Sequence, residues 1–103
     1  MRFETTPRFD GDWKALPAEH KRVFRSLMPA FNAACEGHVG NPGGFVWPAN
    51  LRTTQLVSAK GIWEMTWSFK GPDGRATFEF ITINGETAVR WRRIGRHAVL
   101  TQP

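Results

Sequence analysis

Four arginines and one histidine stand close together near the end of the chain, where they can bind and cleave a phosphodiester. The segment RWRRIGRHAVL, residues 90–100, places them in a run that otherwise has the apolar character of a β-strand. A guanidinium can donate two parallel hydrogen bonds to a phosphate, and histidine exchanges protons near neutral pH. We therefore expect phosphate contacts from Arg90, Arg92, Arg93 and Arg96, and proton transfer by His97.

Two more candidates lie in strand-like segments upstream of this cluster. In IWEMTWSF and RATFEF, apolar residues alternate with polar ones that include Glu64 and Arg75. Successive side chains of a strand point to opposite faces, so the polar set should share the face away from the core. We expect that face to be open and to carry Glu64, Thr66, Arg75, Thr77, Glu79, Arg90 and Arg92. The alternative is a solvated surface whose glutamates and arginines pair across strands.

The alternation slips once, at Arg93, which falls where a core residue belongs. A β-bulge there would return Ile94 to the core side of the sheet and re-aim the neighbouring arginines.

This set of residues matches one reaction that needs no metal, the cleavage of RNA by its own 2′-hydroxyl. Glu64 or His97 can exchange protons with the reacting oxygens, and the arginines can stabilise the charged phosphorane. No group of histidines, cysteines and carboxylates has metal-ligand spacing, so we predict neither a metal nor a cofactor. We expect His20 and His38 to be structural, and the single cysteine, Cys35, to be a core residue.

The elements that must position these residues indicate a single α+β domain over residues 1–103. The pattern predicts a strand at 2–6, a helix over 7–16 and a second helix from 17 to Gly37, kinked or restarted at Pro29. A glycine-rich loop follows, from which Phe45, Val46 and Trp47 should pack back onto the body. Strands are predicted within 52–58, 61–69, 75–83 and 86–94, with turns at 71–74 and Asn84–Gly85. The expected architecture is a helical hairpin packed on one face of a mostly antiparallel meander.

The bulk properties favour a polyanionic partner. The chain has 103 residues and a formal net charge of +5, which favours nucleic acid, an acidic protein or an anionic membrane surface. A single cysteine allows no internal disulfide and suits a reducing cytoplasm. The first ten residues contain no apolar run, so we expect neither a signal peptide nor a membrane span.

The order of these elements, with the segments FETTPRFDGDWKALP, GIWEMTWSF, DGRATFEF and WRRIGRHAVL, resembles the RelE/ParE toxin superfamily over nearly the full length. The resemblance implies the toxin of a type II toxin–antitoxin pair, with a cognate antitoxin as partner. RelE-like members cleave messenger RNA in the ribosomal A site without a metal and leave a 2′,3′-cyclic phosphate. ParE-like members share the fold and poison DNA gyrase instead.

Three candidates match positions of the RelE-like pattern. Arg75 takes the place of the arginine that contacts the scissile phosphate, Glu64 resembles the acidic residue of the preceding strand, and His97 lies near a catalytic histidine of some members. The chain departs from the pattern near its end, where Leu100 replaces a base-stacking tyrosine or phenylalanine. A tryptophan such as Trp47 is a candidate substitute. We therefore expect a cytoplasmic, ribosome-dependent endoribonuclease that acts on mRNA, with a gyrase poison or a noncatalytic nucleic-acid-binding module as alternatives.

Overall fold

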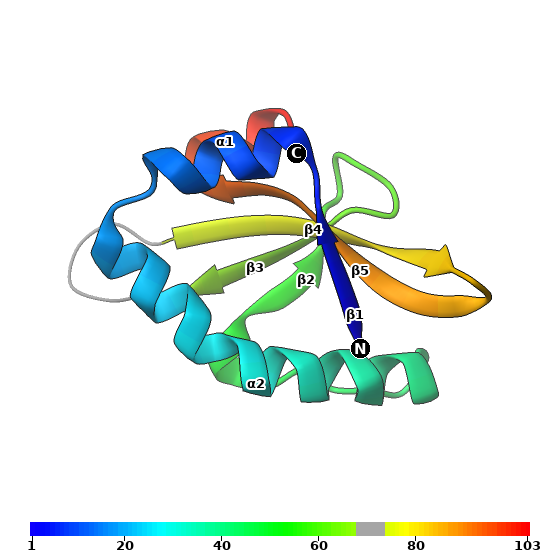
Figure 1. Cartoon of the computed structure of the whole chain (residues 1–103). Helices are drawn as coiled ribbons and strands as arrows, with labels where there is room; N and C mark the ends of the chain where they lie inside the picture. Colours follow the sequence, from blue (N-terminus) through cyan, green and yellow to red (C-terminus); the bar gives the residue numbers. More distant parts are fainter. Residues whose placement is uncertain (68–73) are drawn as a thin grey trace.

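The computed structural model describes residues 1–67 and 74–103, apart from the side chain of His97 (Figure 1). Along the chain the elements are β1 (Arg2–Thr5), α1 (Pro7–Ala15), α2 (Ala18–Gly40), the 3-10 turn η1 (Ala49–Leu51), β2 (Thr53–Gln55), β3 (Trp63–Trp67), β4 (Gly74–Ile83), β5 (Glu86–Gly95) and the 3-10 turn η2 (His97–Thr101). The predicted order of strand, two helices and meander is confirmed. Ser68, Phe69 and most of the turn predicted at 71–74 lie outside the described residues.

The five strands form one mixed sheet in the order β1-β5-β4-β3-β2. The strands β2, β3, β4 and β5 are antiparallel neighbours, whereas β1 pairs in parallel with β5. β1 and β5 can pair in parallel because a long stretch of chain, from α1 through β4, connects them. The chain is therefore a compact α+β domain, as the alternation of residue types predicted.

Both helices bury their apolar sides on the same face of this sheet. The ring of Trp91 on β5 lies 6.2 Å from that of Phe9 on α1, and 5.1 and 4.8 Å from those of Phe24 and Phe31 on α2. Phe31 and Phe78 are fully buried and meet edge to face at 5.1 Å. Aromatic rings of the helices and of the sheet thus meet at this contact, and each removes a large apolar area from water.

The second helix runs further than the sequence predicted. It passes through Pro29, which is exposed, and ends at Gly40 rather than at Gly37. A Cβ atom at position 37 would lie 2.4 Å from Cε1 of Phe45. Gly37 therefore serves close packing of the following loop and does not end the helix. Phe45 and Trp47 pack on the core as expected, whereas Val46 is 84% exposed, so its prediction was wrong.

Two local predictions in the meander are confirmed. Asn84 and Gly85 both have positive φ, of 51° and 80°, as a two-residue hairpin turn requires. The register of β4 and β5 shifts between Thr77, opposite Arg93, and Phe78, opposite Trp91. Arg92 is therefore the extra residue of a bulge, and Ile94 returns to the core, where it is 1% exposed.

Candidate functional site

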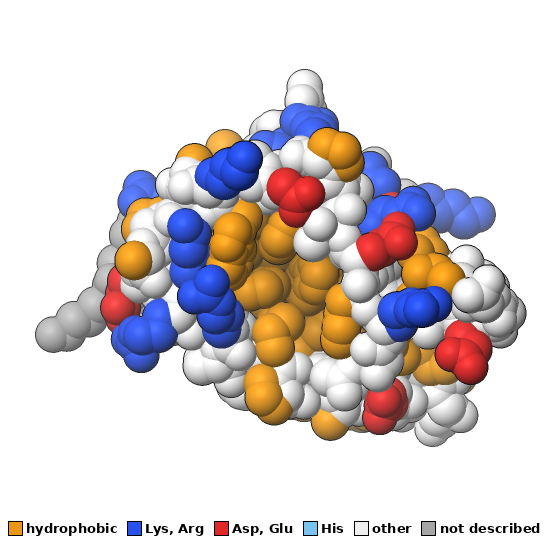
Figure 2. Space-filling model, in the orientation of Figure 1, with side chains coloured by type: hydrophobic (Ala, Val, Ile, Leu, Met, Phe, Trp, Pro, Cys, Tyr) orange, Lys and Arg blue, Asp and Glu red, His pale blue; other side chains and the backbone are white. Residues whose placement is uncertain are grey.

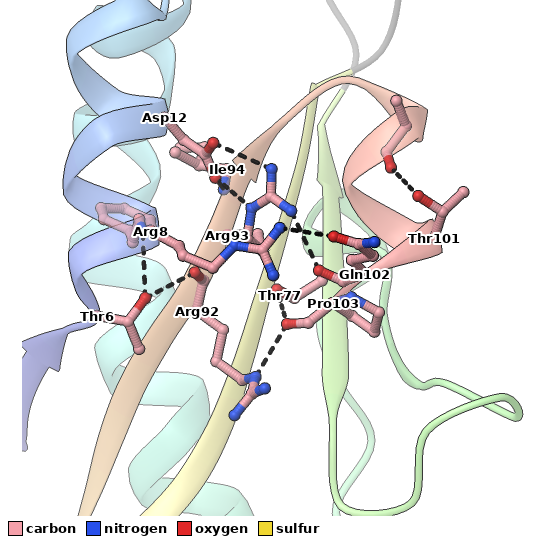
Figure 3. A network of polar contacts seen from close by, with 12 residues as sticks. Thr6, Arg8, Asp12, Thr77, Arg92, Arg93, Ile94, Thr101, Gln102 and Pro103 are labelled. Carbon is pink, nitrogen blue, oxygen red and sulfur yellow. Dashed lines mark hydrogen bonds and ion pairs between the residues drawn. The ribbon is translucent and has the colours of Figure 1, made fainter.

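The sequence predicted that the sheet face opposite the helices is open. This prediction was wrong for part of the face, because the last described residues cross it. Thr66 and Thr77, expected on an open face, are only 2% and 0% exposed. The Thr77 hydroxyl donates a hydrogen bond of 3.2 Å to the main-chain oxygen of Pro103, and Nε of Arg92 donates one of 2.9 Å to the same oxygen (Figure 3). This part of the face therefore binds the C-terminal residues of the protein itself and is not open to a ligand.

Two of the predicted phosphate ligands are engaged in cross-strand ion pairs. Nη1 of Arg92 donates to Glu79 at 2.6 Å, and Nε of Arg90 donates to Glu4 at 2.6 Å. Glu79 stands directly opposite Arg90 in the sheet, and Glu4 does so on the other side. The alternation thus brought opposite charges together, as the alternative interpretation of this face anticipated.

Arg93 ties three segments together at the bulge. Its Nε and Nη2 donate to the two carboxylate oxygens of Asp12 on α1, at 2.6 and 3.1 Å, and its Nη1 donates to the Gln102 carbonyl at 3.2 Å (Figure 3). Asp12 also accepts a hydrogen bond from the main-chain N–H of Ile94. The hydrogen bond to Asp12 raises the pKa of Arg93. The Arg93 guanidinium therefore has a structural role, because it holds α1 and the C-terminal residues against β5.

The fourth arginine of the cluster, Arg96, lines a hollow beside α1. Arg96 is exposed and lines a hollow with Asp12, Leu16 and Pro17, between α1 and the start of η2. It also lies near the buried His20, whose pKa is lowered by burial and by the positive charge of Arg96.

Glu64 and Arg75 do come together, in a hollow of about 370 Å³ that we call the polar hollow. Glu64 lies on β3 and Arg75 on β4, and the pairing of Thr66 with Arg75 makes the two charged residues diagonal neighbours on one face. Such neighbours are separated by about 7–8 Å, close enough for their long side chains to reach one ligand. The polar hollow is lined by Trp47, Pro48, Ala49, Arg52, Thr53, Thr54, Glu64, Thr66 and Arg75.

Both charged groups keep an unused hydrogen-bonding atom. Nη1 of Arg75 donates to the Thr66 hydroxyl, but Nε of Arg75 and Oε2 of Glu64 are buried without a partner among the described residues. Buried polar atoms are nearly always hydrogen-bonded, so each exception calls for an explanation. A ligand in the polar hollow that offers both a hydrogen-bond donor and an anionic acceptor would satisfy the pair once the two side chains turn toward it, because both atoms are buried as the side chains stand.

The sequence did not single out Arg52, which also lines the polar hollow. It follows η1 and has a left-handed backbone with φ of 42° and ψ of 55°. Residues other than glycine rarely adopt this backbone conformation, and those that do are often found at functional sites. Nothing in the sequence signals it, because Arg52 reads as the first residue of a strand.

The structure leaves the role of His97 as a prediction. Its backbone begins η2, two residues after Gly95, which pairs with Arg75. That places the His97 backbone beyond the Arg75 end of the two strands, while its side chain lies outside the described part of the chain.

Within residues 1–67 and 74–103, no group of three or more histidines, cysteines or carboxylates is arranged to hold a metal ion. None of the helices described there is long and apolar enough to cross a membrane. The chain matches no protein-family profile, no curated protein and no solved structure at a significant level.

Proposed function

We propose that this chain cleaves RNA at the polar hollow and is the toxin of a type II toxin–antitoxin pair. The observation that carries the proposal is the placement of Glu64 and Arg75 in one hollow, each with a buried polar atom that lacks a partner among the described residues. A carboxylate beside a guanidinium supplies the two groups that metal-free RNA cleavage needs most, a proton acceptor and a cation for the phosphate.

The reaction forms a bond between the 2′ oxygen and phosphorus and breaks the bond from phosphorus to the 5′ oxygen. Glu64 accepts the proton of the 2′-hydroxyl, and Arg75 stabilises the negative charge that builds up on the phosphate oxygens. The departing 5′ oxygen takes a proton, for which His97 is the candidate. The products are a 2′,3′-cyclic phosphate and a 5′-hydroxyl.

The ion pairs change which arginines we assign to the phosphate. An RNA phosphate at Arg90, Arg92 or Arg93 would compete with a carboxylate that is already paired with that arginine. We assign the direct phosphate contacts to Arg52 and Arg75 because both line the polar hollow beside Glu64; Arg52 also has a contact within the protein, with which a phosphate would compete. The excess positive charge of the chain, Arg96 included, then attracts RNA over a longer range.

The test is cleavage of a defined message on programmed ribosomes, with the ends of the products mapped. Glu64→Gln should slow cleavage by about 100- to 10,000-fold, since it removes the base, and Arg75→Gln by about 100- to 1,000-fold. Glu86→Gln and Arg22→Gln are matched controls, because both residues are exposed and lie outside the polar hollow. A 2′-deoxy nucleotide at the cleaved position should stop the reaction in every variant.

Three results would overturn this assignment. The first is an intact message with the wild-type chain, and the second is full cleavage by the Glu64→Gln, Arg75→Gln double variant. The third is salt-dependent RNA binding without turnover, which would identify a noncatalytic binding module. Inhibition of supercoiling by purified gyrase, together with an intact message, would identify a ParE-like toxin.

A second surface supports the proposal of an antitoxin. Between α1 and α2 lies a hollow of about 340 Å³, visible as the apolar depression in Figure 2, which we call the helix hollow. Two cations border it, since Lys21 and Arg25 lie 5.8 and 5.2 Å from the ring of Trp13. An acidic, amphipathic segment of the antitoxin fits this combination of apolar floor and basic rim. The helix hollow is lined by Thr5, Phe9, Asp10, Trp13, Phe24, Arg25, Met28 and Trp91.

The partner is tested by coexpression with the neighbouring genes and copurification. Met28→Glu should release the partner while RNA cleavage continues, because the new carboxylate repels an acidic segment and lies outside the polar hollow. Harmless expression of the chain alone, with nothing copurifying, would contradict the toxin–antitoxin assignment.

A further inference from the structure

The last described residues form a strap across the sheet. We define the strap as residues 98–103, which comprise most of η2 and the two residues after it. Near its start, Val99 is 6% exposed and packs against Gly95, where a Cβ atom would lie 3.0 Å from Cγ1 of the valine. At its end, the main-chain oxygen of Pro103 accepts the hydrogen bond of Thr77 (Figure 3). The strap therefore reaches from the end of β5 to β4.

Both ends of the strap lie next to the catalytic pair. Gly95 stands opposite Arg75 in the pairing of β5 with β4, and Thr77 stands opposite Glu64 in the pairing of β4 with β3. Residues that pair across strands point to the same face, so Thr77 and the Pro103 oxygen that it binds are neighbours of Glu64. An RNA chain that enters the polar hollow over β2 and continues across the sheet therefore meets the strap.

Three arginines hold the end of the strap in place (Figure 3). Nε of Arg92 donates a hydrogen bond of 2.9 Å to the main-chain oxygen of Pro103. Gln102 is held twice, because its main-chain carbonyl accepts from Nη1 of Arg93 at 3.2 Å and its side-chain oxygen accepts from Nη2 of Arg8 at 3.0 Å. A polyanion competes for these same donors.

The strap uses guanidinium atoms that the ion pairs leave over. Arg92 donates to Glu79 through Nη1 and to the strap through Nε. Arg93 donates to Asp12 through Nε and Nη2 and to the strap through Nη1. Displacement of the strap would therefore free one N–H group on each arginine without breaking an ion pair. A phosphate oxygen is a stronger acceptor for such a group than the neutral carbonyl of Gln102, because both partners are then charged.

We infer that the strap closes this face of the free protein and that RNA opens it, taking the freed N–H groups of Arg92 and Arg93 as it enters the polar hollow. This inference rests on the proposed function and names how access to the catalytic pair is regulated. The strap and the RNA compete for one surface. The apparent affinity for RNA is therefore the intrinsic affinity multiplied by the fraction of molecules in which the strap is open.

The first experiment locks the strap to α1. In the double variant Arg8→Cys, Gln102→Cys, a bifunctional thiol reagent with a reducible disulfide bridges two exposed positions, while Cys35 is buried and does not react. The probe is a short 2′-O-methyl RNA, which cannot be cleaved because its nucleophilic hydroxyl is blocked. The locked protein should bind this RNA about 10- to 150-fold more weakly than the same protein after reduction, the range for one charged hydrogen bond.

Three controls accompany the lock. Arg8→Cys and Gln102→Cys, each treated with the reagent alone, carry it at one end only and should bind RNA equally before and after reduction. Gln102→Ala loosens the strap without removing a charge and should bind RNA about 1.4- to 5-fold more tightly, the range for one exposed contact. Gln55→Ala is its matched control, because Gln55 is exposed on β2 and lies outside the polar hollow.

The second experiment follows the strap itself. A nitroxide label attached at Thr101→Cys should become more mobile when the 2′-O-methyl RNA is added. Ser26→Cys on α2 is the matched control, because both hydroxyls are exposed and donate to the main-chain oxygen three residues earlier. The mobility of a label at position 26 should not change.

The outcomes distinguish this inference from the proposed function. If the locked protein binds RNA as tightly as the reduced protein and unmodified RNA is cleaved, the strap does not regulate access and the nuclease assignment stands. If the lock weakens binding reversibly but no RNA is ever cleaved, the strap stands and the catalytic assignment is wrong. An unchanged mobility of the label at position 101 in saturating RNA would overturn the opening of the strap outright.

Discussion

The substitution Arg52→Gly should separate RNA binding from folding more cleanly than any other change in the polar hollow. Arg52 has φ of 42°, in the left-handed region that glycine occupies without strain. Most substitutions of a ligand-binding residue threaten the fold as well as the site. Here the replacement suits the backbone better than the native residue does.

The expected effect on stability is small because opposing contributions nearly cancel. Relief of the left-handed conformation stabilises the folded state by about 1–2 kcal/mol. The greater freedom of glycine in the unfolded chain costs about 0.4–1 kcal/mol. Arg52 also has a contact within the protein, and the loss of an exposed contact costs about 0.2–1 kcal/mol. We therefore expect the free energy of unfolding to stay within about 1 kcal/mol of the wild-type value.

The expected effect on RNA binding is large by comparison. A hydrogen bond from a charged donor to a phosphate contributes about 1.5–3 kcal/mol, which corresponds to about 10- to 150-fold in affinity. The slope of log affinity against log salt should also fall by about one, because one phosphate contact disappears. Arg52→Lys, which keeps a charge, should preserve that slope and bind with intermediate affinity.

Urea denaturation and titration of a fluorescent 2′-O-methyl RNA over a range of salt concentrations give both quantities from the same preparations. Wild-type affinity and salt slope in Arg52→Gly would refute the assignment of Arg52 to the phosphate. A loss of stability of several kcal/mol would refute the reasoning from the backbone conformation.

Three further predictions follow from the contacts of buried groups. Asp12→Ala should destabilise the fold by about 2–4 kcal/mol in urea denaturation, because it strands the Arg93 guanidinium, whose side chain is only 16% exposed; a loss below about 1 kcal/mol would show that the pair contributes little. Burial lowers the pKa of both His20 and His38 in the folded state, so the unfolded chain binds more protons; stability should therefore rise with pH through a window that ends near the ordinary histidine pKa of about 6.5. Measured unfolding free energies should show this slope, His38→Phe should reduce it, and an unchanged slope would exclude His38 as a cause. Burial raises the pKa of the Cys35 thiol to about 12, so a thiol reagent at pH 8 should label the protein only when it unfolds, and rapid labelling of the native protein would contradict the packing.

The strands and helices were predicted correctly where the residue pattern of a segment matches the way in which that segment packs on the core. Alternation identified β3, β4 and β5, and the slip at Arg93 was enough to predict the bulge that returns Ile94 to the core. The prediction that α2 ends at Gly37 was wrong. A glycine is needed there because the ring of Phe45, a residue outside the helix, packs against it. A contact of this kind has no signature in the local sequence.

The arginine cluster shows the same limit at the level of the site. Residue types predicted a basic surface, but Asp12 and Glu4, both far away in the sequence, neutralise Arg93 and Arg90 in the fold. Their carboxylates approach only because β1 pairs in parallel with β5 and α1 follows directly from β1. The distribution of charge over a surface depends on such pairings, which residue spacing alone does not reveal.

By itself, the amino-acid sequence determined the α+β architecture and the alternation of faces along β3, β4 and β5, which puts Glu64 and Arg75 on the same face. Strand alternation and helical periodicity are local properties of a chain. Only the tertiary structure decided that most of the clustered arginines are paired and that Arg52 and Trp47 line the same hollow as Glu64 and Arg75. Those facts arise where the loop after α2 folds back on the edge of the sheet, and such long-range contacts depend on the packing of the whole molecule.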